Sequence, residues 1–385
     1  MDHSSSLRIE GAVEEDGSWF KTGGGKPSNH GRSYSGVVGK IALLLAAVAV
    51  TCLVLNQSSY SAHLFQSSSA NLFTLGNRGG LSSPACDASV SSPPLHLQGV
   101  AEDKVLKNVL REAAMTDGKT VIITTLNAAW TEPDSIFDLF LQSFTIGNQT
   151  QDLLKHVVVG ALDQTAYSRC LDAHLHCYAL TTAGVNFSGE AYFMSEDYLK
   201  MMWRRIDFLR TVLQLGFDFV FTDADVLWLR NPFERFFPEG DFQIACDHYW
   251  YNSTDPENSP NGGFNYVKSS NRTIEFYRYW HAGKDYYPGK HDQDVLNYIK
   301  LNPYVEELGL KMRFLDTAYF GGFCEPSKDL DLVVTMHANC CIGLDNKIHD
   351  IQMAIDDWKR YTSAGPSGVA RNSTLRSWTM PRLCG

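Results

Sequence analysis

The sequence predicts an α/β protein with a mostly parallel sheet and helices on both faces. From residue 104 onward, short apolar or β-branched runs alternate with longer stretches of helical spacing. Such alternation is typical of parallel strands connected by helices. Two carboxylates, Asp223 and Asp225, directly follow one of the apolar runs. In parallel sheets, ligands bind beyond the carboxyl ends of the strands, so these residues indicate where a site lies.

The expected elements can be placed in order along the chain. Residues 104–114 and 135–144 have helical spacing, whereas residues 121–125 (VIITT) and 156–162 (HVVVGAL) are strand-like. A long helix is expected over residues 195–215, with Ser195 as its N-cap and Gly216 as its stop. The apolar strand 217–222 (FDFVFT) follows this helix at once and leads into the two carboxylates.

Length and composition indicate a globular chain whose partners do not include nucleic acid. The chain has 385 residues, of which 44% are hydrophobic, enough for a large core. Its formal charge of -10 does not supply the basic face that phosphate backbones require. A small anionic substrate remains compatible with this charge, because a metal ion and a few local cations can neutralise a diphosphate.

The N-terminal third predicts a membrane anchor followed by a stem. Residues 1–36 are polar and Gly-rich and predict a disordered cytosolic tail. Residues 37–55 include the uncharged run IALLLAAVAVTCLVL, which is long enough to span a thin membrane. Cations precede this run far more often than they follow it, which places residues 101–385, the expected catalytic domain, in the lumen. Residues 56–100 are rich in Ser, Gly and Pro and read as a flexible stem. A cleaved signal peptide is the alternative, but the leader of about 35 polar residues is long for one.

Sequons and cysteines fit a lumenal domain. Asn-X-Ser/Thr sequons occur at Asn56, Asn148, Asn186, Asn252, Asn271 and Asn372. Eight of the nine cysteines follow the apolar run, and lumenal conditions permit disulfides among them. Their pairing does not follow from the sequence, and no spacing typical of a structural zinc site is present.

The strongest local signal for chemistry is the segment FVFTDADVLWLRNPF. Asp223 and Asp225 are one residue apart, so a turning backbone can direct both carboxylates to one side, where they repel each other unless a cation lies between them. Hard oxygen ligands suit Mn²⁺ or Mg²⁺, which can bridge to a diphosphate and neutralise the charge of a departing group. The alternative is a solvated Asp turn, but the apolar runs on both sides favour the metal site.

Two further segments place polar groups in aromatic surroundings. The run 261–265 (NGGFN) provides two glycines, Gly262 and Gly263, whose backbone can approach a ligand, and amides such as Asn265 that can bond hydroxyls. A Gly-rich hairpin is its alternative reading. The run 291–294 (HDQD) supplies Asp292 and Gln293 just before a helical stretch. Its alternative is an ordinary acidic first turn, which the helix dipole favours.

A third candidate is the strand-like run 333–339, VVTMHAN, with Lys347 further along. A lone histidine is usually structural, but the imidazole of His337 is a good third ligand for Mn²⁺ beside two carboxylates. His291 and His349 compete with it for this role. Lys347 is placed to bind a leaving diphosphate.

These residues resemble a known family. From Thr120 onward, the segments TVIITTLNAAW, KMMWRRIDFLRTVLQLGFDFVFTDADVLWLRNPF, NGGFNYVKSSNRTIEFYRYW and HDQDVLNYIK are similar to the plant nucleotide-diphospho-sugar transferases of glycosyltransferase family 77, which includes cell-wall arabinosyl- and xylosyltransferases. The resemblance implies a GT-A fold, a single-pass type II Golgi membrane protein, a UDP-sugar donor, a glycan or glycoprotein acceptor, and retention of anomeric configuration.

The resemblance also implies roles for individual residues. Asp223, Asp225 and His337 would hold the metal, and Asp292 and Gln293 would face the reacting sugar. Six residues are expected to contact the donor: Thr124, Thr125, Asn127, Arg205, Asp223 and Lys347. Asp223 thus belongs both to this group and to the metal motif. The segment from His337 to Lys347 is looser than the corresponding His, Gly, Lys pattern of relatives. Gly262, Gly263 and Asn265 are expected to bind substrate.

Two rival functions come from other classes. Phosphatases of the haloacid dehalogenase type also end a strand in Asp-X-Asp and bind Mg²⁺, but they favour Thr or Val where this chain has Leu227. A lumenal binding protein that has lost catalysis would keep the same metal ligands. Donor hydrolysis by the purified protein separates both rivals from a transferase.

Overall fold

The computed structural model describes residues 95–182, 184–190, 192–371 and 373–384. The expected cytosolic tail, membrane segment 37–55 and most of the stem lie outside these residues. Within the described ranges, no helix is both long and apolar enough to cross a bilayer. The described residues all belong to the compact unit Ser89–Gly385.

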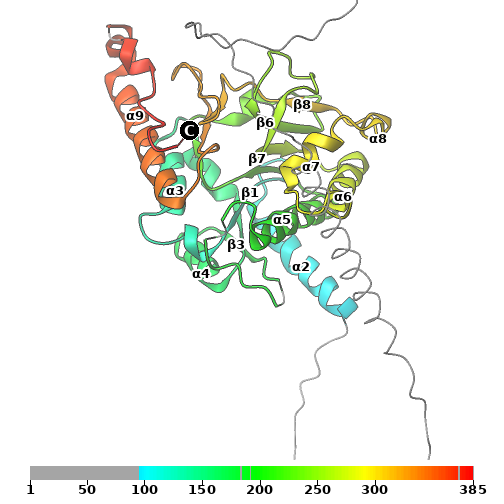
Figure 1. The fold of residues 1–385 in the computed structure, drawn as a ribbon. Helices are drawn as coiled ribbons and strands as arrows, with labels where there is room; N and C mark the ends of the chain where they lie inside the picture. Colours follow the sequence, from blue (N-terminus) through cyan, green and yellow to red (C-terminus); the bar gives the residue numbers. More distant parts are fainter. Residues whose placement is uncertain (1–94, 183, 191, 372, 385) are drawn as a thin grey trace, which may run out of the picture. The chain divides into compact units, whose positions relative to one another are not determined.

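A sheet with the strand order β3-β2-β1-β4-β7-β6-β8 forms the centre of this unit (Figure 1). Its strands are β1 Thr120–Leu126, β2 Val157–Ala161, β3 His176–Ala179, β4 Asp218–Thr222, β6 Phe242–His248, β7 Ser259–Val267 and β8 Met312–Phe314. All neighbours are parallel except that β7 runs antiparallel to both β4 and β6. The mostly parallel sheet predicted from the sequence is therefore confirmed, with one reversed strand at its centre.

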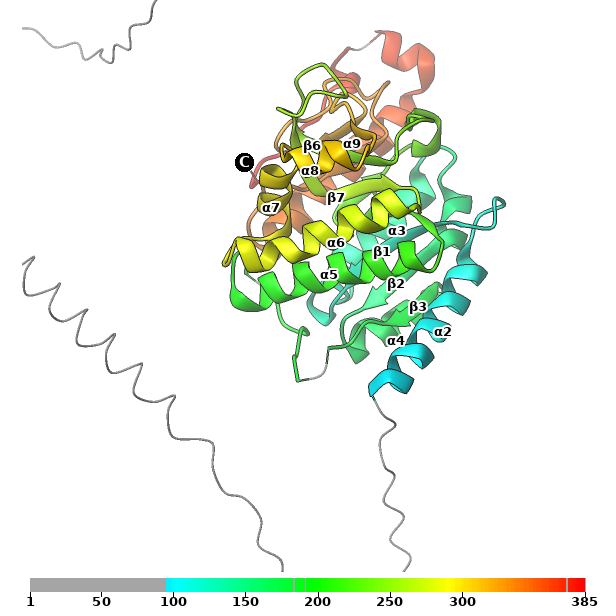
Figure 2. The ribbon, with the colours of Figure 1, turned by 90° about the vertical axis from the view of Figure 1, so that its right-hand side faces the viewer.

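The sheet is covered on both faces, which explains its nearly continuous apolar strands. Along β1, Val121 and Ile123 belong to the core cluster that includes residues of α5 and α6, whereas Ile122 belongs to the cluster on the opposite face. Figure 2 shows α5 and α6 lying in front of the sheet and α3 behind it. Side chains of successive strand residues point to opposite faces, so both sides of β1 are buried.

The helices follow the predicted order with shifted bounds. The elements are α2 Leu95–Ala113, α3 Ile136–Ile146, α4 Gln164–Asp172, α5 Glu196–Gln214, α6 Asn271–Tyr286, α7 Asp292–Ile299, α8 Pro303–Glu307 and α9 Leu344–Arg371, with short 3-10 turns at Ala128–Trp130, Gln151–His156, Pro232–Arg235 and Ser373–Arg376. The first helix begins at Leu95, ahead of the predicted residue 104. His156 ends a 3-10 turn instead of opening a strand.

Helix α5 begins and ends where its capping residues predict. The Ser195 hydroxyl accepts a hydrogen bond from the backbone N–H of Tyr198, which satisfies one free donor of the first turn. At the other end, Gly216 has φ +90°, a left-handed conformation that glycine adopts without steric cost. The chain then turns directly into β4, so this helix positions the strand that carries the two carboxylates.

A second, smaller sheet forms beyond the carboxyl end of β4. It consists of β5 Val226–Trp228, β10 Thr335–His337 and β9 Phe320–Gly322, in the order β5-β10-β9. Strand β10 is antiparallel to β5, with His337 opposite Val226. This register brings a residue from the C-terminal part of the chain beside Asp225.

Three disulfides join described cysteines: Cys170–Cys177, Cys324–Cys340 and Cys341–Cys384. Cys246 is buried and unpaired. The bridge between Cys324 and Cys340 connects the segments that follow β9 and β10, and therefore fixes the loop that comes after His337. Such bridges form in oxidising compartments.

Candidate metal and nucleotide-sugar site

Asp223 and Asp225 lie in the short connection between the large and the small sheet. The backbone N–H of Asp223 donates to the carbonyl of Gly263 at 2.7 Å, and the N–H of Val226 donates to the carbonyl of Asp223 at 3.2 Å. These two bonds hold a tight turn directly after β4. The turn places both carboxylates at the carboxyl edge of the sheet, as predicted from the strand end.

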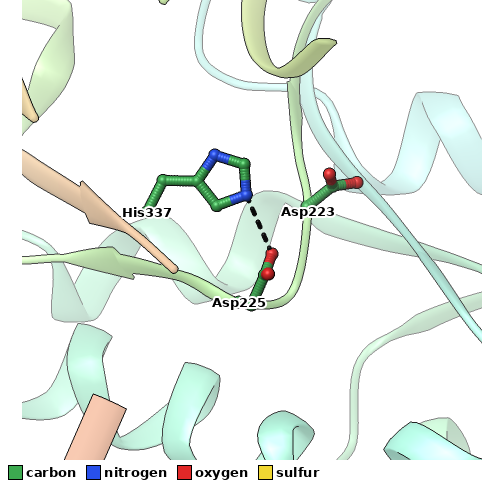
Figure 3. A group of neighbouring side chains, drawn as sticks. All are labelled: Asp223, Asp225 and His337. Atoms are coloured by element: carbon green, nitrogen blue, oxygen red, sulfur yellow. Dashed lines mark hydrogen bonds and ion pairs between the residues drawn. The ribbon is translucent and has the colours of Figure 1, made fainter. Parts of the chain in front are cut away.

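His337 completes a group of three candidate metal ligands with Asp223 and Asp225. One ligand atom from each residue can be chosen so that all three lie within 4.8 Å of one another. His337 Nε2 is 3.1 Å from Asp225 Oδ1, and Figure 3 shows the imidazole turned toward that carboxylate. The competing histidines lie elsewhere: His291 is paired with Asp292 and Asp294, and His349 with Asp350.

Asp225 is a buried anion with cationic or potentially cationic neighbours on both oxygens. Its side chain is 2% exposed, its Oδ1 faces His337, and its Oδ2 is 2.5 Å from Lys347 Nζ. Burial alone would raise the pKa of the Asp225 carboxyl, but Lys347 and His337 outweigh it and lower that pKa. Asp225 is therefore charged at neutral pH and available to a cation.

The surroundings of Asp223 shift the pKa of its carboxyl in the opposite direction to that of Asp225. Burial and the charge of Asp225 raise the pKa of the Asp223 carboxyl, despite the guanidinium of Arg205. A divalent cation between the two carboxylates would relieve their repulsion and favour the charged form of Asp223. The donor set, two carboxylates and an imidazole, suits Mn²⁺ and also accommodates Mg²⁺.

Arg205 connects the candidate metal ligands to α7. Its guanidinium is 2.9 Å from Asp223 Oδ1 and 2.6 Å from Asp292 Oδ2, and it lies over the Phe221 ring at 4.9 Å. Burial raises the pKa of the Asp292 carboxyl, but Arg205 and His291 outweigh it, so the pKa is lowered. Asp292 is thus an ion-paired carboxylate, 1% exposed, and not a solvated first-turn acid.

The two glycines lie inside strand β7, not in a hairpin turn. A Cβ on Gly263 would be 2.4 Å from His337 Cε1 and 2.6 Å from Asp223 Oδ2, so only glycine leaves both side chains where they are. Gly262 donates its N–H to Gln293 Oε1 at 3.0 Å. Asn265 is buried and bonded to Gly262 O and to the Tyr277 hydroxyl, which makes it a support for the glycines.

A network of amides surrounds Asp247, a residue that the sequence interpretation missed. Asp247 Oδ1 accepts from Asn261 Nδ2 at 2.8 Å and from Asn339 Nδ2 at 2.7 Å, and its Oδ2 accepts from Gln293 Nε2 at 2.8 Å. The network joins β6, β7, α7 and the segment after β10 in one polar surface. Asp247 lies at the end of an apolar strand, FQIACDH, which is the same signal that identified Asp223.

The predicted donor contacts at the end of β1 lie around the segment that follows β3. Asn127 Nδ2 donates to the carbonyls of Phe187 and Gly189, both at 2.9 Å, and therefore holds that segment in place. Thr124 is buried and its hydroxyl has no hydrogen-bond partner among the described residues. Thr125 packs its methyl group near Gly160. No direct contact links these three side chains to the carboxylates in the structure.

Comparisons with known proteins agree with this site. The family model described as nucleotide-diphospho-sugar transferase matches residues 152–351, which include Arg205, both carboxylates and His337. The uncharacterized protein At4g15970 of Arabidopsis thaliana is 54% identical over 73% of this chain and 74% of its own length. The uncharacterized protein At1g28695 of the same plant is 40% identical over 67% of this chain and 79% of its own.

A more distant relative has a named activity. The β-arabinofuranosyltransferase RAY1 of Arabidopsis thaliana is 29% identical over 30% of this chain and 22% of its own length. The match to the family model spans more than half of the chain, and it includes the three candidate metal ligands, Lys347 and the amide network around Asp247, whereas Thr124, Thr125 and Asn127 precede it. This chain belongs to the nucleotide-diphospho-sugar transferase family.

Proposed function

We propose that this chain transfers a sugar from a UDP-sugar to a hydroxyl group of a cell-wall glycan or glycoprotein, with Mn²⁺ or Mg²⁺ as cofactor and with retention of anomeric configuration. The observation that carries the proposal is the group of Asp223, Asp225 and His337 beside Lys347 and the Asp247 amide network. One end of this site suits a diphosphate and the other suits sugar hydroxyls.

The diphosphate end is built from Asp223, Asp225, His337 and Lys347. When bound by the first three residues, a divalent cation would neutralise the charge that develops on the diphosphate as the sugar leaves. Lys347 Nζ is bonded to Asp225 and to the carbonyl of Ala338 at 2.8 Å. A cation held by Asp225 would weaken the attraction of that carboxylate for Lys347, and the ammonium group would then be available to the diphosphate.

The sugar end is built from polar groups whose orientation is fixed. Gln293 accepts the Gly262 N–H and donates to Asp247, so its amide plane is set by two bonds. Asp247 receives three amide N–H groups, which fix its orientation and occupy much of its accepting capacity. Such pre-organised groups hold sugar hydroxyls in place without reorganisation during reaction.

We propose same-face attack for the transfer step. The bond between the sugar C1 and the phosphate oxygen breaks, the acceptor oxygen bonds to C1 on the same face, and the acceptor proton passes to the released UDP. Asp292 is too buried and too tightly paired with Arg205 to act as a nucleophile. Asp247 is the only alternative carboxylate in the described amide network, and a covalent intermediate on it would give retention by two steps.

The proposed location is the Golgi membrane, as a single-pass type II protein with the catalytic domain in the lumen. It is supported by the apolar run within residues 37–55, by the sequons, and by the three disulfides of the described residues. Protease treatment of intact microsomes is expected to remove only the short N-terminal tail. Complete digestion without detergent would contradict this topology.

A screen of UDP-sugars tests the function. Purified protein is incubated with each donor and Mn²⁺, and released UDP is measured with and without a mixture of plant glycans. We expect slow hydrolysis of one or a few UDP-sugars, faster release with an acceptor, and no release in EDTA. A protein that binds UDP but never releases it from any donor would be a binding protein that has lost catalysis.

The anomeric configuration of the first product, followed by NMR, tests retention. Gln293→Ala is expected to lower turnover by about 10 to 100-fold, because an orienting group is lost while the diphosphate end is intact. Asp247→Asn separates the two retaining routes, since loss of a covalent nucleophile lowers turnover far more than loss of one hydrogen-bond acceptor. A product of inverted configuration would contradict both routes.

A further inference from the structure

The loop between β6 and β7 exposes two adjacent aromatic side chains beyond the sugar end of the site. Trp250 is 57% exposed and Tyr251 is 90% exposed, although large aromatic side chains are usually well buried. Both follow Asp247 by only three or four residues. Figure 2 shows this loop beyond the end of β6, the strand that runs parallel to β8 and carries Asp247 at its carboxyl end.

The backbone of this loop is held in place from several sides. The N–H of Trp250 donates to Asn258 Oδ1 at 2.7 Å, and the N–H of Tyr249 donates to Glu325 Oε2 at 2.9 Å. Asn258 is completely buried, and its amide donates to the carbonyls of Asn252 and Asp255. These hydrogen bonds fix the backbone at the base of the loop. The loop therefore holds the two exposed rings at a defined position on the surface.

Tyr251 also has an unfavourable backbone conformation. Its φ is +63°, a left-handed value that a bulky residue rarely adopts. Strain of this kind persists where the surrounding structure enforces it, and it gathers at binding sites. At Tyr251 the strained backbone carries the most exposed large aromatic side chain among the described residues. Packing does not explain this arrangement, because the ring contacts almost nothing.

We propose that Trp250 and Tyr251 form a platform on which the acceptor glycan stacks, an inference that rests on the proposed function. Faces of sugar rings carry C–H groups that pack on aromatic rings, while the hydroxyl groups around the sugar remain free for hydrogen bonds. The diphosphate occupies the opposite end, near Lys347, so a chain that extends past Asp247 is the acceptor. The platform binds sugar units beyond the one that receives the transfer.

The test uses acceptor length as its readout. Wild-type protein is assayed with oligosaccharides of one to four units prepared from the glycan that the screen identifies as acceptor. We expect KM to fall with length in wild type. Trp250→Ala and Tyr251→Gly should each raise KM for the longer acceptors by roughly 10-fold and flatten the length dependence, because one stacking surface is removed. Glycine keeps the positive φ of residue 251 without strain.

Conservative and distant variants control for indirect effects. Trp250→Phe and Tyr251→Phe keep a ring and should preserve most of the length dependence. Tyr286→Ala removes a tyrosine that is 77% exposed at the end of α6 and should behave as wild type. Hydrolysis of the donor by water should be unchanged in all variants, since the platform contacts only the acceptor.

Several outcomes overturn the proposal, and they differ from a failure of the proposed function. If the wild-type protein neither hydrolyses a donor nor transfers a sugar, the proposed function itself is wrong, and the platform falls with it. If wild type is active but both ring deletions keep a normal KM for the longest acceptor, the platform does not exist. Asn252 begins a sequon two residues after Trp250. If the defects disappear in protein made without N-glycans, the rings pack against the protein's own glycan instead.

Discussion

At the scale of residues, Lys347 would compete with a divalent cation for the same carboxylate oxygen in the proposed site. Lys347 Nζ lies 2.5 Å from Asp225 Oδ2, while His337 is bonded to the other oxygen. The lysine therefore acts as a counterion that keeps Asp225 charged in the absence of metal. This explains how the Asp-X-Asp segment can fold without a bound cation, despite burial and mutual repulsion.

Replacing Lys347 with Met should separate metal binding from turnover. We expect Mn²⁺ to bind about 10-fold more tightly, because the competing ammonium group is gone, and turnover to fall by roughly 100-fold, because the diphosphate loses a cation. Mn²⁺ titration by calorimetry and steady-state kinetics measure the two effects. Lys200→Met, which removes a surface partner of Glu196, is the matched control. Unchanged affinity for Mn²⁺ would refute the competition.

The buried pair of Arg205 and Asp292 predicts a specific pH dependence. The pKa of the Asp292 carboxyl is lower in the folded protein than the value near 3.9 of an unfolded chain. Folding then releases protons, so this stabilisation is complete above about pH 4 and is lost as the pH falls through the folded pKa.

Asp292→Asn should therefore be less stable than wild type by about 2 to 4 kcal/mol at pH 7, with the difference shrinking below about pH 4. Urea unfolding across this range measures it. Asp294→Asn, on the same turn but partly exposed, should change the unfolding free energy by less than about 0.5 kcal/mol. A deficit for Asp292→Asn that stays constant at acid pH would show that its charge is not responsible.

At the scale of elements, β7 is the strand on which the site depends. It lies between β4 and β6 and is antiparallel to both. Its two glycines, Gly262 and Gly263, therefore lie beside the carboxyl ends of these two strands. Gly263 O accepts the N–H of Asp223, while Gly262 N–H donates to Gln293. One strand thus aligns the diphosphate end with the sugar end.

Gly263→Ala should damage ligand binding more than folding. The added methyl group would meet His337 Cε1 and Asp223 Oδ2 well inside normal contact distance, so these two side chains must move apart. We expect affinity for UDP and Mn²⁺ to fall by about 100-fold with a modest decrease in Tm. The control is Gly189→Ala, where a Cβ meets nothing within 4 Å. Normal UDP affinity in Gly263→Ala would mean that the glycine has no role in the site.

Local signals explain which elements could be predicted from the sequence. Ser195 and Gly216 bound α5 because capping depends on neighbouring residues, and β-branched runs identify β1 and β2. The reversed direction of β7 has no local signal, since it depends on which strands lie beside it. The run 261–265 was therefore interpreted as a ligand-binding backbone or a Gly-rich hairpin, and its position inside a strand was not predicted.

The same distinction holds for the site. Asp223 and Asp225 were predictable because both lie at one strand end, and His337 was weighed against two other histidines until the register of β10 with β5 placed it. The three amides around Asp247 come from three separate segments, and only the tertiary structure brings them together. Thr124 and Asn127, which the resemblance assigned to donor binding, lie near the end of β1, and Asn127 is bonded to the backbone of the segment after β3.

At the scale of the whole molecule, the site is assembled from segments that lie between residues 205 and 347, about half of the described chain. Arg205 comes from α5, the carboxylates follow β4, Gln293 comes from α7, His337 ends β10 and Lys347 lies in α9. The disulfide between Cys324 and Cys340 fixes the loop after His337. The three candidate metal ligands are therefore in place only when both sheets are formed.

The most direct test of this account is the binding of UDP to the purified domain by titration calorimetry, with Mn²⁺ and with EDTA. We predict clear binding with Mn²⁺ and a loss of at least about 100-fold in EDTA, since the diphosphate is held mainly through the metal. Asp225→Asn should show the same loss in the presence of Mn²⁺ while keeping a cooperative thermal unfolding transition. Equal UDP affinity in Mn²⁺ and EDTA, or normal affinity in Asp225→Asn, would contradict the central claim that Asp223, Asp225 and His337 form a metal-dependent nucleotide-sugar site.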